Sequence, residues 1–267
     1  MKKSSLLILI SVGLLFWNGV AFGTPSTTYW TPATTDIQPF GILHIGVDNY
    51  FTVFKKAKNG GSSFATDVGL TIGVLPFEKL QMEVGVDLME PTDYPISFNA
   101  KLGTPEDSLF KGSPAMNIGI FNVGTKKNVT NQNIVFGLVG KTIPVLGRLF
   151  VGPYIGNSRA LVDKHGDKEN VGFMIGFDHG FFPAKDNEGN EYKKIVLAAD
   201  YASGKNSIGG GGVGLYYYFT KDISLLTGPV WFNEKAINGK WKWTVQLDIN
   251  VDPVKGFKKL FSLGEYK

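Results

Sequence analysis

The sequence contains no cysteine and only three histidines among its 267 residues. The absence of cysteine excludes a disulfide scaffold, thiolate catalysis, Cys-ligated zinc, iron–sulfur clusters and c-type haem. Charged residues make up 19% of the chain, and the net charge of +4 comes from scattered Lys and Arg. A nucleic-acid-binding domain carries a clustered basic patch, so we expect no nucleic acid among the partners.

The three histidines are not placed for catalysis. His44 lies in GILHIGVDNY and His179 in FDHGFF, and neither has a serine nearby to form the Ser–His pair that an esterase needs. His165 lies in the polar run LVDKHGDKEN, whose acidic residues lack the spacing of a calcium loop. No His-x-x-x-His metal motif occurs. We therefore expect no enzyme activity, no cofactor and no metal site.

The first 23 residues, MKKSSLLILISVGLLFWNGVAFG, have the pattern of a secretory signal peptide. Two lysines precede a long apolar run, and Ala21 and Gly23 are small residues before the expected cleavage site. An uncleaved membrane anchor is the alternative, because the apolar run is at the short end of what spans a bilayer. No later apolar run approaches 18 residues, so we predict no transmembrane helix after it. Export without disulfides fits a Gram-negative periplasm or outer membrane.

Apolar and polar residues alternate through most of the remaining chain. The clearest runs are TDVGLTIGV (66–74), LQMEVGVDL (80–88) and WKWTVQLDINV (241–251). Successive side chains of a strand point to opposite faces, so each run predicts a strand with one apolar and one polar face. Roughly twelve strands are expected, near residues 40–52, 66–75, 79–89, 95–103, 114–123, 132–142, 148–157, 170–179, 193–202, 210–219, 222–232 and 240–251.

The connections between these strands differ in length. Tight turns are expected after strands 2, 6 and 10, and longer polar loops after strands 1, 5, 7 and 11. Short turns at one end and long loops at the other are typical of an outer-membrane barrel. The links after strands 4 and 8, TPEDSLFKGSP and FFPAKDNEGNEY, should be short in such a barrel and are long in the sequence.

Two interpretations compete for the apolar faces. In a soluble β-barrel they form the core, whereas in a transmembrane barrel they face lipid and the polar faces line the lumen. The polar-face positions are rich in Gly, Asn, Thr, Ser and Tyr, and aromatic residues gather at the strand ends. Both features, with the even strand number, favour the transmembrane barrel. The side chains then predicted to face lipid include Leu70, Val84, Leu138 and Leu247.

By this pattern, residues 40–251 resemble bacterial outer-membrane β-barrel proteins of the porin-like kind. In size they are similar to the twelve-stranded group, which includes nucleoside-specific channels, small oligosaccharide porins and the outer-membrane phospholipase. The resemblance implies an all-β fold, a transmembrane antiparallel up-and-down β-barrel of about twelve strands in contact with outer-membrane lipid. One departure is the C-terminus, because such proteins commonly end on an aromatic residue of the last strand, whereas DPVKGFKKLFSLGEYK follows here.

The expected organisation is a signal peptide (1–23), a periplasmic N-terminal segment (24–39), the barrel (40–252) and a C-terminal amphipathic tail (253–267). Apolar residues and lysines alternate in the tail with a spacing that suits an interfacial helix. The sequence leaves open whether the segment 24–39 enters and plugs the pore.

The leading functional hypothesis is a channel or porin-like pore for small hydrophilic solutes. A non-conducting structural or adhesive barrel is the first alternative, since twelve strands fall between filled eight-stranded barrels and open sixteen-stranded porins. A secreted soluble β-barrel that binds an apolar ligand is the second. The sequence leaves the solute and the oligomeric state open.

Three carboxylates are expected to lie close together in the lumen. Asp48, Asp67 and Asp87 share the polar face, and each lies about eight residues from the same end of its strand. Glu83 is placed lower on the same wall. This placement predicts an acidic zone near the extracellular mouth that favours cations. Like charges at such distances disfavour joint ionisation, so at least one of the three Asp should have a raised pKa or hold a cation.

Basic residues are expected mostly at the other end of the barrel. Lys101, Lys141 and Arg148 fall there and predict a basic zone toward the periplasm, while Lys242 could instead neutralise the carboxylates. The candidate lumen and selectivity residues are therefore Asp48, Asp67, Glu83, Asp87, Lys101, Lys141 and Lys242.

Overall fold

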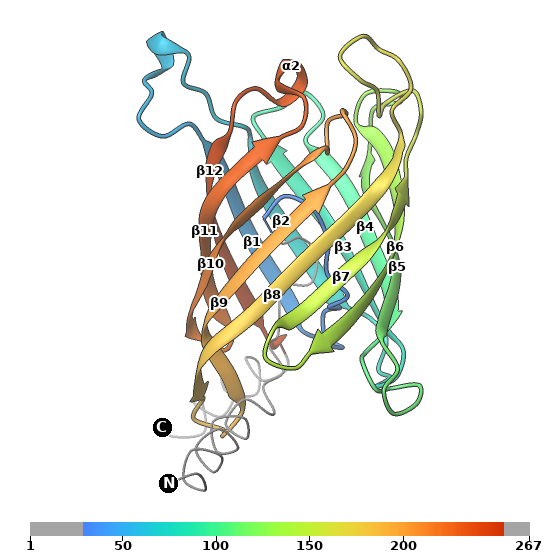
Figure 1. Ribbon diagram of the computed structural model, residues 1–267, viewed down its shortest axis with the longest axis vertical. Coiled ribbons are helices and arrows are strands. Elements are labelled where there is room, and N and C mark those ends of the chain that lie inside the picture. Colours follow the sequence, from blue (N-terminus) through green and yellow to red (C-terminus); the bar gives the residue numbers. More distant parts are fainter. Residues whose placement is uncertain (1–28, 254–267) are drawn as a thin grey trace, which may run out of the picture.

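The computed structural model describes residues 29–253, which form one closed antiparallel barrel of twelve strands (Figure 1). Each strand pairs with its sequence neighbours, and the first pairs with the last. The strands are β1 (Leu43–Phe51), β2 (Thr66–Gly73), β3 (Gln81–Glu90), β4 (Ile96–Thr104), β5 (Ala115–Gly124), β6 (Asn131–Ile143), β7 (Gly147–Ile155), β8 (Val171–Lys185), β9 (Glu191–Ala202), β10 (Gly210–Thr220), β11 (Ile223–Phe232) and β12 (Lys242–Val251). The predicted all-β barrel of about twelve strands is confirmed. The predicted signal peptide (1–23) and all of the tail but Pro253 lie outside the described residues.

The two ends of the barrel differ, as most of the connection lengths predicted. The exceptions include residues 74–80 after β2, which do not form the tight turn that was expected, and residues 125–130 after β5, a shorter loop than expected. β1 begins and β12 ends at one end, here called the turn end, together with the short connections 144–146 and 221–222. The opposite end, the loop end, carries the longer connections 52–65, 156–170 and 233–241. Two short helices, η1 (Ala57–Asn59) and α2 (Lys235–Asn238), lie in these loops. Within residues 29–253, neither these nor any other helix has the length and apolar character needed to cross a bilayer.

The connection after β8 is shorter than the sequence indicated. β8 continues to Lys185 and stays paired with β9 as far as Glu191, so only residues 186–190 form the turn. The Asp186 carboxylate closes this turn by accepting the backbone N–H groups of Glu188 and Asn190, each at 2.8 Å. The expected long link after strand 8 was wrong because charged residues and Pro183 interrupt the apolar alternation without ending the ladder. The link after β4, residues 105–114, is long as expected.

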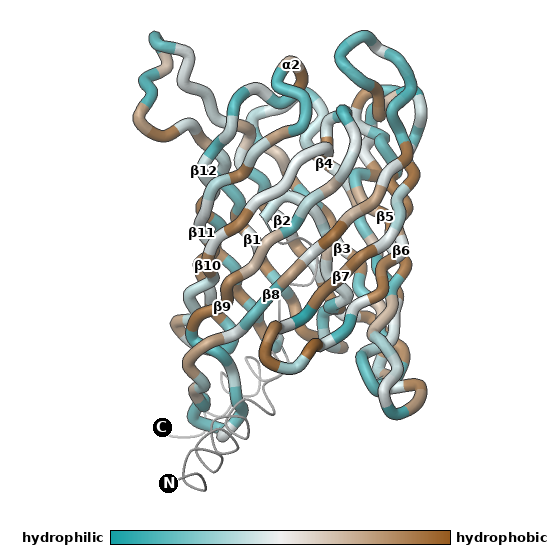
Figure 2. Tube along the Cα trace, in the orientation of Figure 1, coloured by the Kyte–Doolittle hydropathy of each residue, from teal (hydrophilic) through white to brown (hydrophobic). Residues whose placement is uncertain are grey.

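Apolar side chains point away from the lumen around the barrel. Exposed large apolar residues recur at alternate positions of most strands. Figure 2 shows hydrophobic residues along the strands of the wall and mostly hydrophilic residues in the loop-end connections. Leu70 is exposed on this surface, while Val84 and Leu247 alternate with the buried Glu83 and Gln246 and share the outward face. Lipid solvates such an exterior better than water does.

Leu138 was predicted to face lipid, and that prediction was wrong. It is only 2% exposed and packs in the lumen with Phe136, while Val135 and Val139 point outward at 38% and 46% exposure. The run IVFGLVG in β6 is apolar on both faces, so the alternation there does not reveal which face turns inward.

A substitution on each face tests this orientation. Leu70→Arg should lower the free energy of unfolding in a bilayer by about 2–4 kcal/mol if the residue lies near the midplane, because the guanidinium would enter hydrocarbon. Asn99→Arg is the control, since Asn99 lines the lumen cavity and hydrogen-bonds Asp87, so an arginine there gains a carboxylate partner. Greater loss of stability in Asn99→Arg than in Leu70→Arg would mean that the two faces are inverted.

Residues 29–39, here called the lumen segment, lie inside the barrel (Figure 1, blue). Its side chains are mostly buried, with Tyr29 and Thr31 fully so. Glycines of the wall make room for it, since a Cβ at Gly176 would lie 1.9 Å from the Ala33 carbonyl oxygen. The sequence placed the segment 24–39 in the periplasm and left its entry into the pore open; the described part of it is inside the lumen, and residues 24–28 lie outside the described range.

Candidate functional site

The first residues of the lumen segment are held near the loop end. The Asp200 carboxylate of β9 accepts the backbone N–H groups of Tyr29 and Trp30, the latter at 2.9 Å. The Tyr29 carbonyl in turn accepts the Tyr50 hydroxyl at 2.8 Å and the Gln246 amide at 3.1 Å. The wall therefore binds the segment's backbone through side chains of β1, β9 and β12.

Trp30 sits in an aromatic cluster at the same level. Its ring centroid lies 5.4 Å from that of Tyr50, 5.7 Å from Phe64 and 4.9 Å from Phe232. Its ring N–H donates to the Ile208 carbonyl at 2.9 Å. The pairs with Tyr50 and Phe232 are edge-to-face, whereas the Phe64 ring is tilted by 32° from the Trp30 plane. Edge-to-face pairs each contribute about 0.5–1.5 kcal/mol beyond burial, so Trp30 is a principal contact between the segment and the wall.

Towards the turn end the segment crosses the lumen. The Asn117 amide of β5 donates to the Thr34 carbonyl at 2.9 Å. Further along the segment, the Gln38 backbone N–H donates to Glu83 of β3 at 2.6 Å, and the Gln38 side chain donates to Asn250 of β12 at 3.0 Å. The last part of the segment thus connects walls on both sides of the lumen.

Arg148 of β7 holds two carboxylates at once. Its two terminal nitrogens bind the Asp36 oxygens of the lumen segment at 2.6 and 2.8 Å. Its Nε also donates to Asp178 of β8 at 2.9 Å. Bidentate arginine–carboxylate contacts are among the stronger hydrogen bonds in proteins, so Arg148 binds Asp36, the one charged residue of the segment, strongly.

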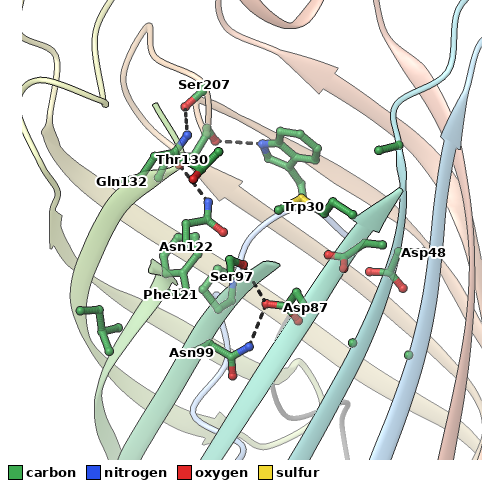
Figure 3. Close-up of a pocket in the computed structure, with 18 of the residues that line it drawn as sticks. Trp30, Asp48, Asp87, Ser97, Asn99, Phe121, Asn122, Thr130, Gln132 and Ser207 are labelled. Atoms are coloured by element: carbon green, nitrogen blue, oxygen red, sulfur yellow. Dashed lines mark hydrogen bonds between the residues drawn. The ribbon is translucent and has the colours of Figure 1, made fainter. Parts of the chain in front are cut away.

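Beside the lumen segment lies a cavity of about 410 Å³ (Figure 3). This volume falls within the range of about 300–1,000 Å³ that is usual for small-molecule sites. Its lining reaches the loop-end connections at Phe64, Thr130 and Ser207, and includes His44 and Lys101 toward the turn end. None of the described lining residues belongs to a turn-end connection. The cavity therefore extends along the lumen from the loop end to the level where the segment crosses.

Five carboxylates of the described chain line this cavity, and Glu83 among them pairs with Lys101. The other four come from adjacent strands and are here called the acidic wall: Asp48, Asp67, Asp87 and Asp248. Asp48 lies directly opposite Asp67 in the register of β1 and β2. Asp87 lies opposite Gly69, two residues from Asp67, and Asp248 opposite Gly46, two residues from Asp48. Neighbouring strands are about 4.8 Å apart, so the structure brings the three sequence candidates together and adds a fourth. Asp248 was missed because only closure of β12 onto β1 brings it to this wall, although the alternation of WKWTVQLDINV puts it on the polar face.

The acidic-wall carboxylates Asp48, Asp67 and Asp87 have no basic partner among residues 29–253. No Lys, Arg or His lies within 4.0 Å of Asp48, Asp67 or Asp87. Asp87 accepts a hydrogen bond from the Asn99 amide at 2.9 Å, and one oxygen of Asp67 is buried without a hydrogen-bond partner. Within the described chain no three acidic or histidine side chains converge as metal ligands do. The acidic wall is an extended negative surface.

The lysine candidates lie apart from the acidic wall. Lys101 is buried and forms an ion pair with Glu83 at 3.1 Å, and Lys141 pairs with Glu106 at 2.7 Å near the turn end. Lys242 lies toward the loop end, 3.2 Å from the Ser62 hydroxyl and 4.4 Å from the Phe64 ring centre. It does not pair with the carboxylates as the alternative interpretation required.

The predicted basic zone toward the periplasm was wrong. Lys101, Lys141 and Arg148 do lie toward the turn end, but each is bound to at least one carboxylate. Partial burial alone would raise the pKa of Glu106, yet hydrogen bonds from Lys141 and Thr142 hold that pKa below its ordinary value. The turn end therefore contains ion pairs. Among residues 29–253, Asp48, Asp67 and Asp87 of the acidic wall and the separate Lys242 are lumen charges without an ion pair.

No protein-family model and no curated protein sequence matches the chain. Among solved structures it is similar to a membrane protein from work on the mechanism of in-meso crystallization, with 10% identity, a TM-score of 0.43, and 78% of this chain and 83% of that chain covered. It is also similar to Salmonella typhi OmpF in complex with daunomycin (8% identity, TM-score 0.36, coverage 79% and 96%) and to the N-terminal β-barrel domain of Pseudomonas aeruginosa OprF (12%, 0.20, coverage 80% and 100%). These TM-scores are too low to carry an argument, and the closed barrel is established by the chain's own strand pairing.

Proposed function

We propose that the protein is an outer-membrane β-barrel of a Gram-negative bacterium that passes small hydrophilic solutes and prefers cations. The apolar exterior, together with buried charged side chains in the lumen such as Glu83, Lys101 and Asp248, supports a membrane location, because lipid-embedded barrels have this arrangement. Short turns face the periplasm in such barrels and longer loops face the exterior. We therefore assign the turn end to the periplasm and the loop end to the outside of the cell. The barrel acts by binding and passage, and not as an enzyme.

The acidic wall carries this proposal. Asp48, Asp67 and Asp87 line a cavity that extends to the loop end, and none of them has a basic partner within 4.0 Å in the described chain. A confined space lined by charges of one sign raises the local concentration of counter-ions. Acidic side chains around a pore are typical of cation channels. Small cations should therefore enter this cavity more readily than anions.

A non-conducting structural or adhesive barrel is the second candidate function. The lumen segment favours it, because residues 34–38 cross the lumen between β5, β7, β3 and β12. A soluble barrel that binds an apolar ligand fits less well, since apolar side chains cover the exterior and carboxylates line the cavity.

Release of solutes from proteoliposomes tests the proposal. Vesicles containing the purified protein are loaded with a small amine or with a carboxylate of the same size, and release is compared with that from protein-free vesicles. The proposal predicts faster release of the amine. Equal release of the two solutes would contradict the cation preference, and no release of either would favour the non-conducting barrel.

A further inference from the structure

The lumen segment is attached to the barrel without being part of its sheet. None of residues 29–39 forms a strand, and the twelve strands close the barrel by their own ladders. Apart from contacts at its junction with β1, its hydrogen bonds to the barrel involve side chains such as Asn117, Arg148 and Asp200, or loop carbonyls. Withdrawal of the segment would therefore break none of the strand pairing that stabilises the barrel.

The junction between the lumen segment and β1 permits movement. Gly41 lies between Pro39 and the first residue of β1, and its φ of 74° is in the left-handed region. A Cβ placed at this glycine would meet no atom within 4 Å. The Gly41 N–H donates to the Gly73 carbonyl of β2 at 2.9 Å, a hydrogen bond that turning at this residue must break. Glycine adopts both signs of φ readily, which suits a point about which the segment can turn.

Arg148 and Glu83, which bind the segment, each have a second charged partner in the wall. Arg148 binds Asp36 of the segment but also Asp178 of β8. Glu83 accepts the Gln38 N–H but also pairs with Lys101 at 3.1 Å. Leaving a buried charge without a partner is strongly unfavourable. Arg148 and Glu83 keep a partner when the segment leaves, while Asp200 gives up the backbone N–H groups of Tyr29 and Trp30.

We propose that the lumen segment is a displaceable gate of the pore and that Arg148 holds it closed through Asp36. This inference rests on the proposed function of the cavity and assigns its regulation. In the closed state the segment separates the cavity from the turn end. In the open state the segment has turned about Gly41 and no longer separates the cavity from the turn end. Solutes then have a continuous path through the lumen.

Single-channel recording of the full-length chain tests the gate. Arg148→Gln removes the bidentate contact with Asp36, and a closed protein whose open state is a minor one, about 0.1–10% populated, should then open roughly tenfold more often. Lys185→Gln is the matched control, because Lys185 forms an ion pair with Glu191 at 3.0 Å in the turn-end hairpin without contacting the segment. Channels of this control should open as often as those of the unchanged protein.

A cross-link provides a second measurement that leaves Arg148 unchanged. The chain has no cysteine, so Thr34→Cys with Asn117→Cys gives a specific site for a cleavable thiol cross-linker across a contact of 2.9 Å. Cross-linking should abolish openings, and cleavage of the linker should restore them. An unchanged conductance after complete cross-linking would overturn the gate.

The two proposals fail in different ways. A folded Arg148→Gln barrel, identified by its anomalous migration on unheated gels, that opens no more often than the control would overturn the role of Arg148. The reversal potential recorded on the same channels reports ion preference separately. If Arg148→Gln opens more often but the reversal potential shows no preference for cations, the gate is supported and the proposed function is contradicted.

Discussion

Replacing Asp48 and Asp67 together with asparagine is expected to remove most of the pore's preference for cations. The two residues face each other across β1 and β2 and line the cavity. Asparagine keeps nearly the same shape but cannot ionise, so the double variant removes the negative charge that the pair carries. One unit charge attracts a cation at 4 Å by about 1 kcal/mol even in bulk water, which corresponds to roughly a fivefold change in local cation concentration for each charge.

The ratio of K⁺ to Cl⁻ permeability, obtained from reversal potentials in a salt gradient, measures this effect. The loss should be larger at low ionic strength, because salt screens charges in water. Asp186→Asn is the control, since Asp186 lies in the turn between β8 and β9 and outside the cavity. An unchanged permeability ratio in the double variant would remove the acidic wall as the origin of selectivity.

Gly176→Val should expel the lumen segment from its position. A Cβ at residue 176 would lie 1.9 Å from the Ala33 carbonyl oxygen, a distance that no backbone atom can tolerate, so the segment must move. Ala33→Cys introduces a single thiol into the cysteine-free chain, and Ala33 is 1% exposed. Maleimide should therefore react slowly in the Gly176 background and at least about tenfold faster with Gly176→Val, since labelling follows the population of the exposed state.

Gly137→Val is the matched control for this substitution. Gly137 lies in β6, and the nearest atom to a Cβ there is the Asn117 carbonyl oxygen at an ordinary 3.6 Å. In the Gly137→Val variant, maleimide should label Cys at position 33 as slowly as it does in the protein with both wall glycines intact. Equally slow labelling in both valine variants would show that Ala33 does not lie against Gly176.

The strand pattern could be predicted because period-two alternation is a local property. Runs such as WKWTVQLDINV identify a strand and its two faces without reference to any other part of the chain. Tight turns fix the register of neighbouring strands, and counting from them placed Asp48, Asp67 and Asp87 at one level, where β1, β2 and β3 bring them. The prediction failed for Leu138 because β6 is apolar on both faces, so no local signal distinguishes lumen from lipid.

The position of the lumen segment could not be predicted, because it depends on residues far apart in the sequence. Arg148 and Asp36 are separated by 112 positions, and Tyr29 and Asp200 by 171. Wall glycines such as Gly176 and Gly212 showed that the lumen needed space, but not what fills it. The pairing of Lys101 with Glu83 was hidden for a similar reason, since it requires the β3–β4 register in which the two residues are opposite.

The reversal potential of the unmodified protein in a planar bilayer tests the central claim most directly. With a tenfold KCl gradient across the membrane, a pore governed by the acidic wall gives a reversal potential of the sign that K⁺ permeation produces. The account predicts this sign and a shift toward zero as salt is raised. A reversal potential at zero or of the opposite sign, recorded from folded protein at low salt, would contradict it.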